Sequence, residues 1–324
     1  MHTRRIDLHT HSSASDGTDS PAALARKAAA CGLAAFALTD HDSTDGLAEA
    51  GAEAARLGLK FVPGVEIAVR RGERELHILG LFLPMFSAAP EKSGLNGSAE
   101  PLKGISSSAL EQSLAGIRAR RDTRNRAVLD RLAALGMPLD PEDVRRRAGG
   151  KAVGRPHMAA ALAAAGYVAD GREAFIRFLG RGCPAYVPRN LSSPEEGIAL
   201  LRRESPVVSL AHPFLSPTMT GSELDDILAE FRPLGLTALE AWHSDHGPEQ
   251  TGICLESARK HGLAVTGGSD YHGENKKNIA LGTGRGNLSV PLSLLEDLER
   301  RFFSEEVPLR HTPAAGRPGL PQDR

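Results

Sequence analysis

The stretch Ile6-Asp7-Leu8-His9-Thr10-His11 places two histidines directly after a short apolar segment. Such a segment, close to polar turn residues, is typical of a buried β-strand. Residues two apart in an extended chain face the same side, so both imidazoles can reach one ion. A single His-x-His pair is usually an ordinary polar strand end, so its meaning depends on the residues at the ends of the other strands.

Strand and helix signals alternate along most of the chain. Ser20 and Pro21 predict the start of a helix that Gly32 closes. Strands are expected at residues 6–8, 33–38, 61–62, 65–69, 76–82, 207–210, 236–242 and 263–266, and further helices at 46–57, 194–203, 224–231 and 249–261. Strands that alternate with helices indicate a mostly parallel sheet, and there are enough units here to close an α/β barrel.

The middle of the chain has a different character. Residues 87–108 are rich in Ser, Gly, Pro and Ala, which predicts a flexible loop. Residues 109–179 carry helical signals, and residues 109–188 are interpreted as an inserted helical cap subdomain, so that the barrel comprises residues 1–86 and 189–310. Residues 118–155 contain ten Arg and one Lys against five acidic residues. That surplus indicates either a solvated surface or a cap that meets phosphates, and the tail 311–324 is expected to be disordered.

Composition excludes several classes of protein. Of 324 residues, 41% are hydrophobic, enough for a large core, while only 4% are aromatic, which disfavours a base-stacking nucleic-acid module. The net charge of −1 gives no overall electrostatic attraction for either anionic or cationic partners. The three cysteines are scattered and predict neither disulfides nor a Cys-x-x-Cys site. With no apolar run near the roughly 20 residues of a membrane span and no signal peptide, we expect a cytoplasmic protein without a membrane partner.

Imidazoles and carboxylates recur where the expected strands end or run. Besides His9 and His11, the candidates are Asp16, Asp40, His41, Asp42, Glu66, His77, His212, Asp270 and His272. Barrel enzymes place their sites on the rim at the carboxyl ends of the strands. Clustering so many charged groups there would be costly without cations between them. The recurrence therefore predicts a metal centre, which no single motif would.

These motifs resemble those of the PHP (polymerase and histidinol phosphatase) family. The matching pieces occur in the family's order: Asp7-Leu8-His9-Thr10-His11-Ser12, Ser15-Asp16-Gly17, Leu38-Thr39-Asp40-His41-Asp42, Gly64-Val65-Glu66, His77, Ala211-His212-Pro213 and Gly268-Ser269-Asp270-Tyr271-His272. The resemblance implies a distorted (β/α)7, TIM-like barrel that holds two to three divalent metal ions.

The resemblance also implies a ligand set for each ion. One ion would take His9, His11, Glu66 and Asp270; a second would take Glu66, His77 and His212; a third would take Asp16, His41 and His272. Mixed imidazole and carboxylate ligands suit Mn²⁺, which we expect first, or Zn²⁺ or Fe²⁺. Asp16, His41, Glu66, Asp270 and His272 are the expected catalytic residues. Asp7, Asp40 and Asp42 would either orient the ligating imidazoles or make local turn hydrogen bonds.

The insert resembles that of the family branch that hydrolyses nucleoside 3′,5′-bisphosphates and trims short RNA from its 5′ end. The similar pieces are Gly154-Arg155-Pro156-His157, Glu173-Ala174-Phe175 and Pro184-Ala185-Tyr186-Val187. The resemblance implies that basic residues of the insert hold the non-reacting phosphate. Arg155 is the first candidate because it lies at an expected helix N-terminus, and Lys151 and Arg189 follow. His157 is left open between site and core. His243 and His246 are expected in a loop at the rim, where they either lie on the surface, the favoured placement, or line the pocket.

The function expected from these features is metal-dependent hydrolysis of a phosphomonoester. The resemblance indicates a small nucleotide as substrate, a nucleoside 3′,5′-bisphosphate or AMP, with no required protein partner. Three alternatives stay open: a 5′-3′ exoribonuclease acting on short RNA, a histidinol-phosphate-type phosphatase, and a non-catalytic metal-binding module. No Ser-His-Asp arrangement is evident, so water rather than a side chain is the expected nucleophile.

Overall fold

The apolar stretches build one curved sheet. The computed structural model describes residues 4–85, 108–149 and 152–304, and its strand order is β7-β6-β5-β4-β3-β2-β1-β8. The strands are β1 (Arg5–Asp7), β2 (Leu33–Leu38), β3 (Lys60–Arg71), β4 (Arg74–Leu81), β5 (Val207–Leu210), β6 (Ala238–His243), β7 (Ala264–Gly268) and β8 (Val290–Pro291). The strands expected at 61–62 and 65–69 are joined in β3, and the two-residue β8 is an addition.

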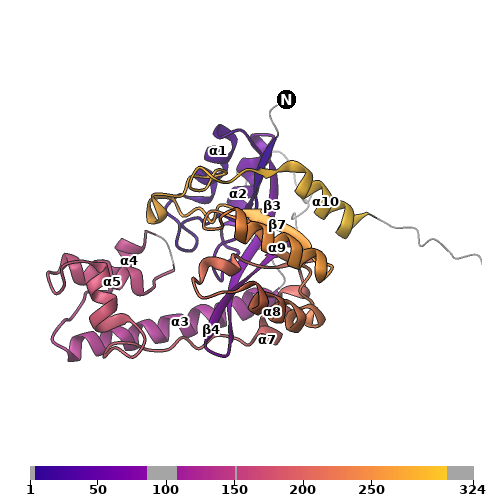
Figure 1. Ribbon diagram of the computed structural model, residues 1–324. Helices are drawn as coiled ribbons and strands as arrows, with labels where there is room; N and C mark the ends of the chain where they lie inside the picture. The colour runs from indigo at the N-terminus through magenta and orange to yellow at the C-terminus, as the bar shows by residue number, and fades with distance from the viewer. Residues whose placement is uncertain (1–3, 86–107, 150–151, 305–324) are drawn as a thin grey trace, which may run out of the picture.

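The sheet closes between β1 and β7. The N–H of Leu8 donates to the carbonyl of Gly267 at 3.1 Å, and Thr10 and Tyr271 form a parallel bridge further along. This join brings the segment after β1 beside the segment after β7, which places His9 and His11 near Asp270. The expected distorted α/β barrel is confirmed (Figure 1).

The hairpin of β3 and β4 departs from the expected mostly parallel arrangement. β4 pairs antiparallel with both β3 and β5, and β8 pairs antiparallel with β1, whereas the pairs β1–β2, β2–β3, β5–β6 and β6–β7 are parallel. The turn needs Gly72, whose φ is 55°. Because no helix separates the two strands, Glu66 and His77 lie within strands, and both side chains reach the rim from the hairpin.

Helices cover the outside of the barrel and fill its hydrophobic core. They are α1 (Pro21–Ala30), α2 (Leu47–Arg56), α7 (Pro194–Arg202), α8 (Gly221–Leu234), α9 (Pro248–Lys260) and α10 (Leu292–Phe303). The Ser20 hydroxyl caps α1 by accepting from the N–H of Ala23, as the sequence indicated. Phe36 and Phe231 are fully buried in the main core cluster. Each such side chain stabilises the fold by roughly 1.5–3 kcal/mol.

The insert has its own core. It contains α3 (Ser108–Ala134), α4 (Pro141–Ala148), α5 (Arg155–Ala164), α6 (Gly171–Ala174) and a π-helical turn (Phe175–Leu179). Figure 1 shows it projecting from one side of the barrel. Leu132 of α3 joins Met158, Leu162 and Leu179 in this cap core, whereas Leu114, nearer the start of α3, joins the barrel core. One helix therefore runs through both parts of the molecule.

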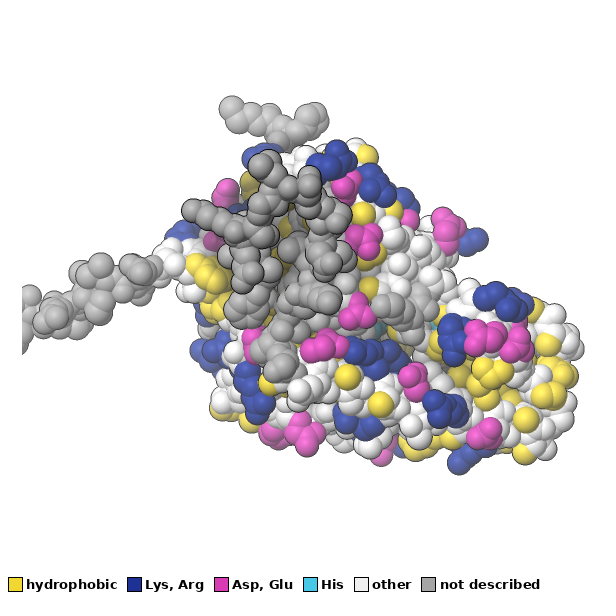
Figure 2. Space-filling view, turned by 180° about the vertical axis from the view of Figure 1, so that it is seen from behind, with side chains coloured by type: hydrophobic (Ala, Val, Ile, Leu, Met, Phe, Trp, Pro, Cys, Tyr) yellow, Lys and Arg dark blue, Asp and Glu magenta, His cyan; other side chains and the backbone are white. Residues whose placement is uncertain are grey.

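Two expectations concern residues outside those described. The predicted flexible loop falls almost entirely within the undescribed residues 86–107, and the predicted disordered tail lies within residues 305–324. Among the described helices, none is both long and apolar enough to cross a membrane. Basic and acidic side chains are intermingled over the face in Figure 2, in keeping with the net charge near zero.

Candidate metal centre

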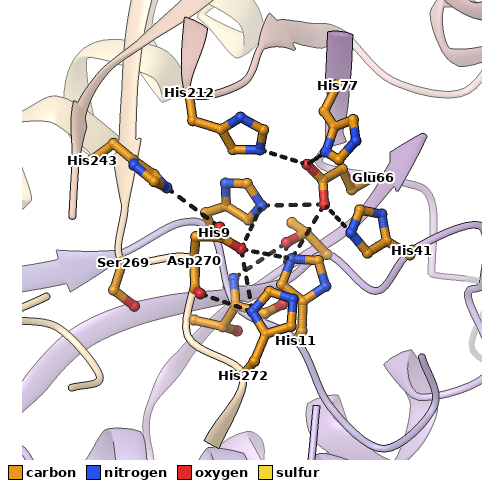
Figure 3. Close-up of polar contacts among 12 residues, drawn as sticks. His9, His11, His41, Glu66, His77, His212, His243, Ser269, Asp270 and His272 are labelled. Atoms are coloured by element: carbon orange, nitrogen blue, oxygen red, sulfur yellow. Dashed lines mark hydrogen bonds and ion pairs between the residues drawn. The ribbon is translucent and has the colours of Figure 1, made fainter. Parts of the chain in front are cut away.

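Glu66 lies at the centre of a cluster of histidines (Figure 3). Its fully buried carboxylate projects from β3. Oε1 lies 2.9 Å from Nδ1 of His77 and 3.1 Å from Nε2 of His212. Oε2 lies 3.4, 3.3 and 3.1 Å from the Nε2 atoms of His9, His11 and His41, respectively. The two oxygens of one carboxylate therefore face two sets of imidazoles.

Asp270 is the second carboxylate of the cluster. Its Oδ1 atom lies 3.7 Å from Nε2 of His9, 3.3 Å from Nε2 of His11 and 3.3 Å from Nδ1 of His272. Its Oδ2 atom is turned away from these rings and lies 2.5 Å from Nζ of Lys276. The residue has a φ of 56°, a left-handed conformation that a non-glycine residue adopts at a cost.

Asp16 completes the cluster on its more exposed side. Its Oδ1 atom lies 3.3 Å from Nε2 of His272 and 3.7 Å from Nδ1 of His11. The side chains of His41 and His77 are 19% and 20% exposed, whereas those of His9 and His11 are fully buried. The cluster thus has a closed inner part and an outer part that solvent reaches.

The arrangement fits divalent ions. Ligand atoms approach within 4.8 Å of one another in four groups: His9, His11 and Asp270; His9, Glu66 and His212; His41, Glu66 and His77; and His11, Asp16, His41 and His272. Within the described part of the chain, four buried atoms among them have no hydrogen-bond partner, namely Nε2 of His9, both ring nitrogens of His11, and Oε2 of Glu66. Unsatisfied buried polar atoms are costly, and cations between them would remove that cost.

The pKa values show how strongly these groups interact. Burial lowers the pKa of His11, but Asp270 and Glu66 outweigh it and raise the pKa to about 9. Burial also lowers the pKa of His77, but the carboxylates of Glu66 and Glu75 outweigh it and raise the pKa to about 10. Burial lowers the pKa of His41 to about 3 despite the nearby carboxylates. A metal ion entering the site would displace protons from some imidazoles and find others already neutral.

Of the two roles left open for Asp7, the local hydrogen bond is present, because its Oδ1 accepts from the N–H of His9 at 3.3 Å. Asp7 also binds residues that are distant in the sequence. Its Oδ1 accepts from the N–H of Ser269 at 2.8 Å, and its Oδ2 accepts from Ser269 Oγ at 2.6 Å and from the N–H of Gly282 at 2.7 Å. Asp7 therefore braces the loop before Asp270 and does not orient an imidazole. The carboxylate that orients His9 is the fully buried Glu240, at 3.1 Å from Nδ1. The sequence shows Glu240 as a lone acidic residue in an apolar strand, and that signal was overlooked.

Asp40 and Asp42 also bind partners other than imidazoles. Asp40 accepts from the N–H and hydroxyl of Ser12 and from the hydroxyl of Ser15, at 2.7, 2.6 and 2.6 Å. These partners lie 28 and 25 residues away in sequence, so Asp40 shapes the loop between His11 and Asp16 and makes, among the described residues, neither the imidazole contact nor the local turn bond expected of it. Oδ2 of Asp42 accepts from Nη1 of Arg121 at 2.8 Å, a contact to the insert that the sequence did not indicate.

The expected surface positions of His243 and His246 are wrong. His243 is the last residue of β6 and is 1% exposed, while His246 is 3% exposed. The centroid of the His243 ring lies 5.2 Å from that of His212. The loop after β6 folds back over the barrel end, so residues that look like rim loop in the sequence lie behind the metal cluster.

A cavity of about 330 Å³ separates the cluster from the insert. Asp16, His41, His77 and His272 line one wall. The other wall carries five arginines, Arg120, Arg121, Arg124, Arg155 and Arg189. The volume lies in the range of roughly 300–1,000 Å³ that small-molecule sites occupy. The cavity therefore joins an acidic and imidazole-rich wall to a strongly basic one.

Two of the three expected phosphate-binding residues line this cavity. Arg155 begins α5, where its Nη1 donates to the carbonyl of Leu179 at 3.1 Å and its guanidinium lies 5.4 Å from the ring centroid of Tyr186. Arg189 is paired with Glu75, which leaves it less charge to offer. Lys151 lies outside the described residues. His157 also lines the cavity, and its Nδ1 accepts from the N–H of Gly154, which caps α5.

Arg124 is a basic residue that the sequence did not single out. It is 8% exposed, and its Nη2 atom has no hydrogen-bond partner among the described residues. Burial and the neighbouring Arg155 and Arg189 lower its pKa to about 10. A buried guanidinium beside other cations is unfavourable unless an anion joins them. This wall of the cavity is therefore suited to a phosphate.

Comparisons with known proteins agree with this site. The family model of the PHP domain matches residues 7–130. The chain is 33% identical over 277 residues to a 3′,5′-nucleoside bisphosphate phosphatase of Chromobacterium violaceum, covering 85% of this chain and 90% of the relative. It is 30% identical over 270 residues to a 5′-3′ exoribonuclease of Haemophilus influenzae, covering 83% of this chain and 90% of the relative.

A solved structure gives the same picture for the fold. A crystal structure described as a metal-dependent phosphoesterase from Bifidobacterium adolescentis superimposes with a TM-score of 0.72 at 29% identity. The alignment covers 93% of this chain and 98% of that chain. Together with the cluster of histidines and carboxylates, these similarities show that the chain belongs to the PHP domain family and is a metal-dependent phosphoesterase.

Proposed function

We propose that this phosphoesterase hydrolyses a phosphomonoester of a nucleotide, first of all the 3′-phosphate of a nucleoside 3′,5′-bisphosphate, with AMP as a related substrate. The observation that carries the proposal is the cavity with two unlike walls. One phosphate would lie against the histidine and carboxylate cluster, and a second would lie against Arg124 and Arg155. The Chromobacterium violaceum relative, named for a bisphosphate substrate, supports this choice.

We propose that two or three divalent ions bind the cluster, with Mn²⁺ as the first expectation and Zn²⁺ or Fe²⁺ as alternatives. His9, His11, Glu66 and Asp270 would hold one ion; Glu66, His77 and His212 a second; and Asp16, His41 and His272 a third. His11 contributes an atom to the group around Asp16 as well as to that around Asp270. Bound ions supply Lewis acidity and ionise water near neutral pH.

The protein's own groups would orient the substrate. Asp16, His41 and His272 line the cavity and would bind the reacting phosphate there, while Glu66 and Asp270, both buried, complete the proposed catalytic set. Arg155 is held in place by the Leu179 carbonyl, so little side-chain entropy is lost when it binds a phosphate. Anchoring the second phosphate would turn the first toward the metal-binding wall.

The test compares adenosine phosphates that differ in the number and position of their phosphates with a minimal ester that has one phosphate and no nucleoside. Phosphate release from adenosine 3′,5′-bisphosphate, 3′-AMP, 5′-AMP and p-nitrophenyl phosphate is measured with Mn²⁺ supplied. We expect the highest kcat/KM for the bisphosphate. Losing a charge-assisted contact costs about 1.5–3 kcal/mol, so Arg124→Met and Arg155→Ala should each lower kcat/KM for the bisphosphate roughly 10- to 150-fold.

The p-nitrophenyl ester is the internal control because it has no second phosphate. Damage to the metal centre would slow both substrates equally, whereas loss of the anchoring contact would slow only the bisphosphate. Equal kcat/KM values for bisphosphate and monophosphates in the wild type would contradict the proposal. Equal losses on both substrates would refute the roles of the two arginines.

A second candidate function is trimming of short RNA from its 5′ end. A groove of about 600 Å³ between α3 and α7 adjoins the cavity and shares Ile117 and Arg120 with it. It could hold nucleotides beyond the first. However, Glu195 and Glu196 also line the groove and would repel phosphates. The exoribonuclease name of the Haemophilus influenzae relative supports this candidate.

A groove variant separates the two functions. Arg203 lines the groove but not the cavity, so Arg203→Glu should slow a 5′-phosphorylated trinucleotide and leave adenosine 3′,5′-bisphosphate unchanged if RNA binds there. If both substrates keep their wild-type rates, the groove does not serve RNA.

A further inference from the structure

His243 occupies an unusual place behind the metal cluster. Its ring is buried against His212 and His246, with centroid distances of 5.2 and 5.3 Å. Figure 3 shows it on the far side of Asp270 from His41, and it is not among the residues that line the cavity. It belongs to none of the four groups of converging ligand atoms among the described residues. A histidine here needs a role other than direct metal binding.

The hydrogen bond at the other ring nitrogen fixes its tautomer. Nδ1 of His243 accepts from the N–H of Asp245 at 3.1 Å, so in the neutral ring the proton resides on Nε2. This buried Nε2–H has no hydrogen-bond partner of good geometry among the described residues, and Oδ2 of Asp270 lies 3.5 Å from it. An unsatisfied buried donor costs about 1–3 kcal/mol, so its direction toward a carboxylate is significant.

The Asp270 carboxylate needs a partner for the oxygen that faces away from the metal centre. Its Oδ1 faces His9, His11 and His272, and its Oδ2 faces Lys276 and His243. Its backbone lies in the left-handed region, a conformation that costs free energy in a non-glycine residue and persists only where surrounding contacts hold it. Lys276 is tethered close by, because Nδ2 of its neighbour Asn275 donates to the Asp16 carbonyl at 2.7 Å. Two donors on one oxygen leave the other oxygen free to ligate.

We propose that His243 is a positioning residue: its Nε2–H directs Oδ2 of Asp270 so that Oδ1 points into the metal centre. The inference rests on the proposed metal centre and adds to it a residue that sets metal affinity without ligating. Donors of this kind typically change metal affinity 10- to 100-fold when removed.

The test uses two amide substitutions that differ only in reach. In His243→Gln the side-chain amide can reach the position of Nε2, whereas in His243→Asn it reaches only that of Nδ1. Binding of Mn²⁺ to chelator-treated protein is followed by electron paramagnetic resonance of the free ion. We expect His243→Asn to weaken the site that holds Asp270 about 10- to 100-fold, and His243→Gln to regain most of that loss.

Two further variants identify the site and the specificity of the effect. Asp270→Asn shows which binding event depends on Asp270, and the His243 variants should weaken that same event. His246→Asn is the matched control, because Nδ1 of His246 donates to the Ala241 carbonyl at 2.9 Å, a bond that Asn can keep. Its Mn²⁺ affinity should equal that of the wild type.

The outcomes are distinguishable. Wild-type protein that binds no Mn²⁺ would refute the metal centre itself. Wild-type affinity in His243→Asn would overturn the positioning role. Equal weakening in the Asn and Gln variants would also overturn it, because the imidazole rather than its hydrogen bond would then be required. Melting temperatures of the metal-free variants show whether each is folded.

Discussion

Glu66 presents both of its oxygens to imidazoles and belongs to two of the four groups of ligand atoms. We therefore expect Glu66→Gln to remove more activity than a change in any residue that only supports a ligand. Supporting changes cost 10- to 100-fold, so kcat/KM of the Glu66 variant should fall by more than about 100-fold on every substrate. Steady-state kinetics with excess Mn²⁺ checks this.

Glu75→Gln is the matched comparison. Glu75 contacts Nε2 of His77 at 3.5 Å and so touches the cluster only through another residue. We expect Glu75→Gln to lower kcat/KM by about 10- to 100-fold, and this decrease should become smaller as the Mn²⁺ concentration is raised. If the two variants lose activity equally at saturating Mn²⁺, the central role of Glu66 is wrong.

Among individual residues, the sequence predicted the histidines and carboxylates that converge in the cluster. It did not predict the residues that hydrogen-bond to them or pack behind them. His9 and Asp270 stand in recognisable motifs after expected strands. Glu240 and Arg124 do not, because only the three-dimensional structure shows that a carboxylate inside an apolar strand meets His9, or that a helix arginine is buried. His243 was misplaced for the same reason, since the path of its loop depends on packing.

Among the elements, the seam between β1 and β7 leaves no room for a larger residue at Gly268. A Cβ added to Gly268 would lie 2.3 Å from the N and 2.4 Å from the Cβ of His9. We expect Gly268→Ala to destabilise the protein by about 1–3 kcal/mol or more and to displace His9. Thermal unfolding and Mn²⁺ binding should both show the loss.

Gly252 in α9 offers a control in which the same substitution should stabilise the protein instead of destabilising it. No atom lies within 4 Å of a Cβ added there, and alanine is the better helix former by roughly 0.5–1 kcal/mol. Gly252→Ala should therefore raise the melting temperature slightly without changing Mn²⁺ affinity. A lower melting temperature in Gly252→Ala than in Gly268→Ala would contradict the packing argument.

The elements themselves were largely predictable. Leu33–Leu38 has the same bounds in sequence and structure, because an apolar run between turn signals leaves little choice. The antiparallel direction of β4 was not predicted, since two adjacent strands pair either way until the short turn at Gly72 is recognised. The amphipathic helix α10 was overlooked beside the polar tail that comes after it.

For the whole molecule, the coupled histidines predict how the stability of the metal-free protein depends on pH. The pKa values of His41 and His212 are lowered to about 3 and about 4, so stability should fall as pH drops below about 6.5, where the unfolded chain takes up more protons. Those of His11 and His77 are raised to about 9 and about 10, so stability should also fall as pH rises from about 6.5 toward those values.

Melting temperatures measured with chelator across pH 4 to 10 should thus pass through a maximum near neutrality. Saturating Mn²⁺ should flatten the alkaline side, because ions replace the protons that His11 and His77 would otherwise lose. A metal-free profile that rises steadily to pH 10 would contradict the assigned interactions.

The helix α3 has a consequence for substrate choice. It has 27 residues, about 40 Å at roughly 1.5 Å per residue, and it is anchored by Leu114 in the barrel and by Leu132 in the cap. Arg120, Arg121 and Arg124 lie between these anchors. Because the helix is packed at both ends, its length fixes the distance between the arginines that it carries and the histidines of the barrel. One alanine inserted between Leu114 and Arg120 would turn the arginines by about 100° relative to the barrel and shift them along the axis, so the length of the helix would set the distance between the proposed phosphate-binding arginines and the histidines.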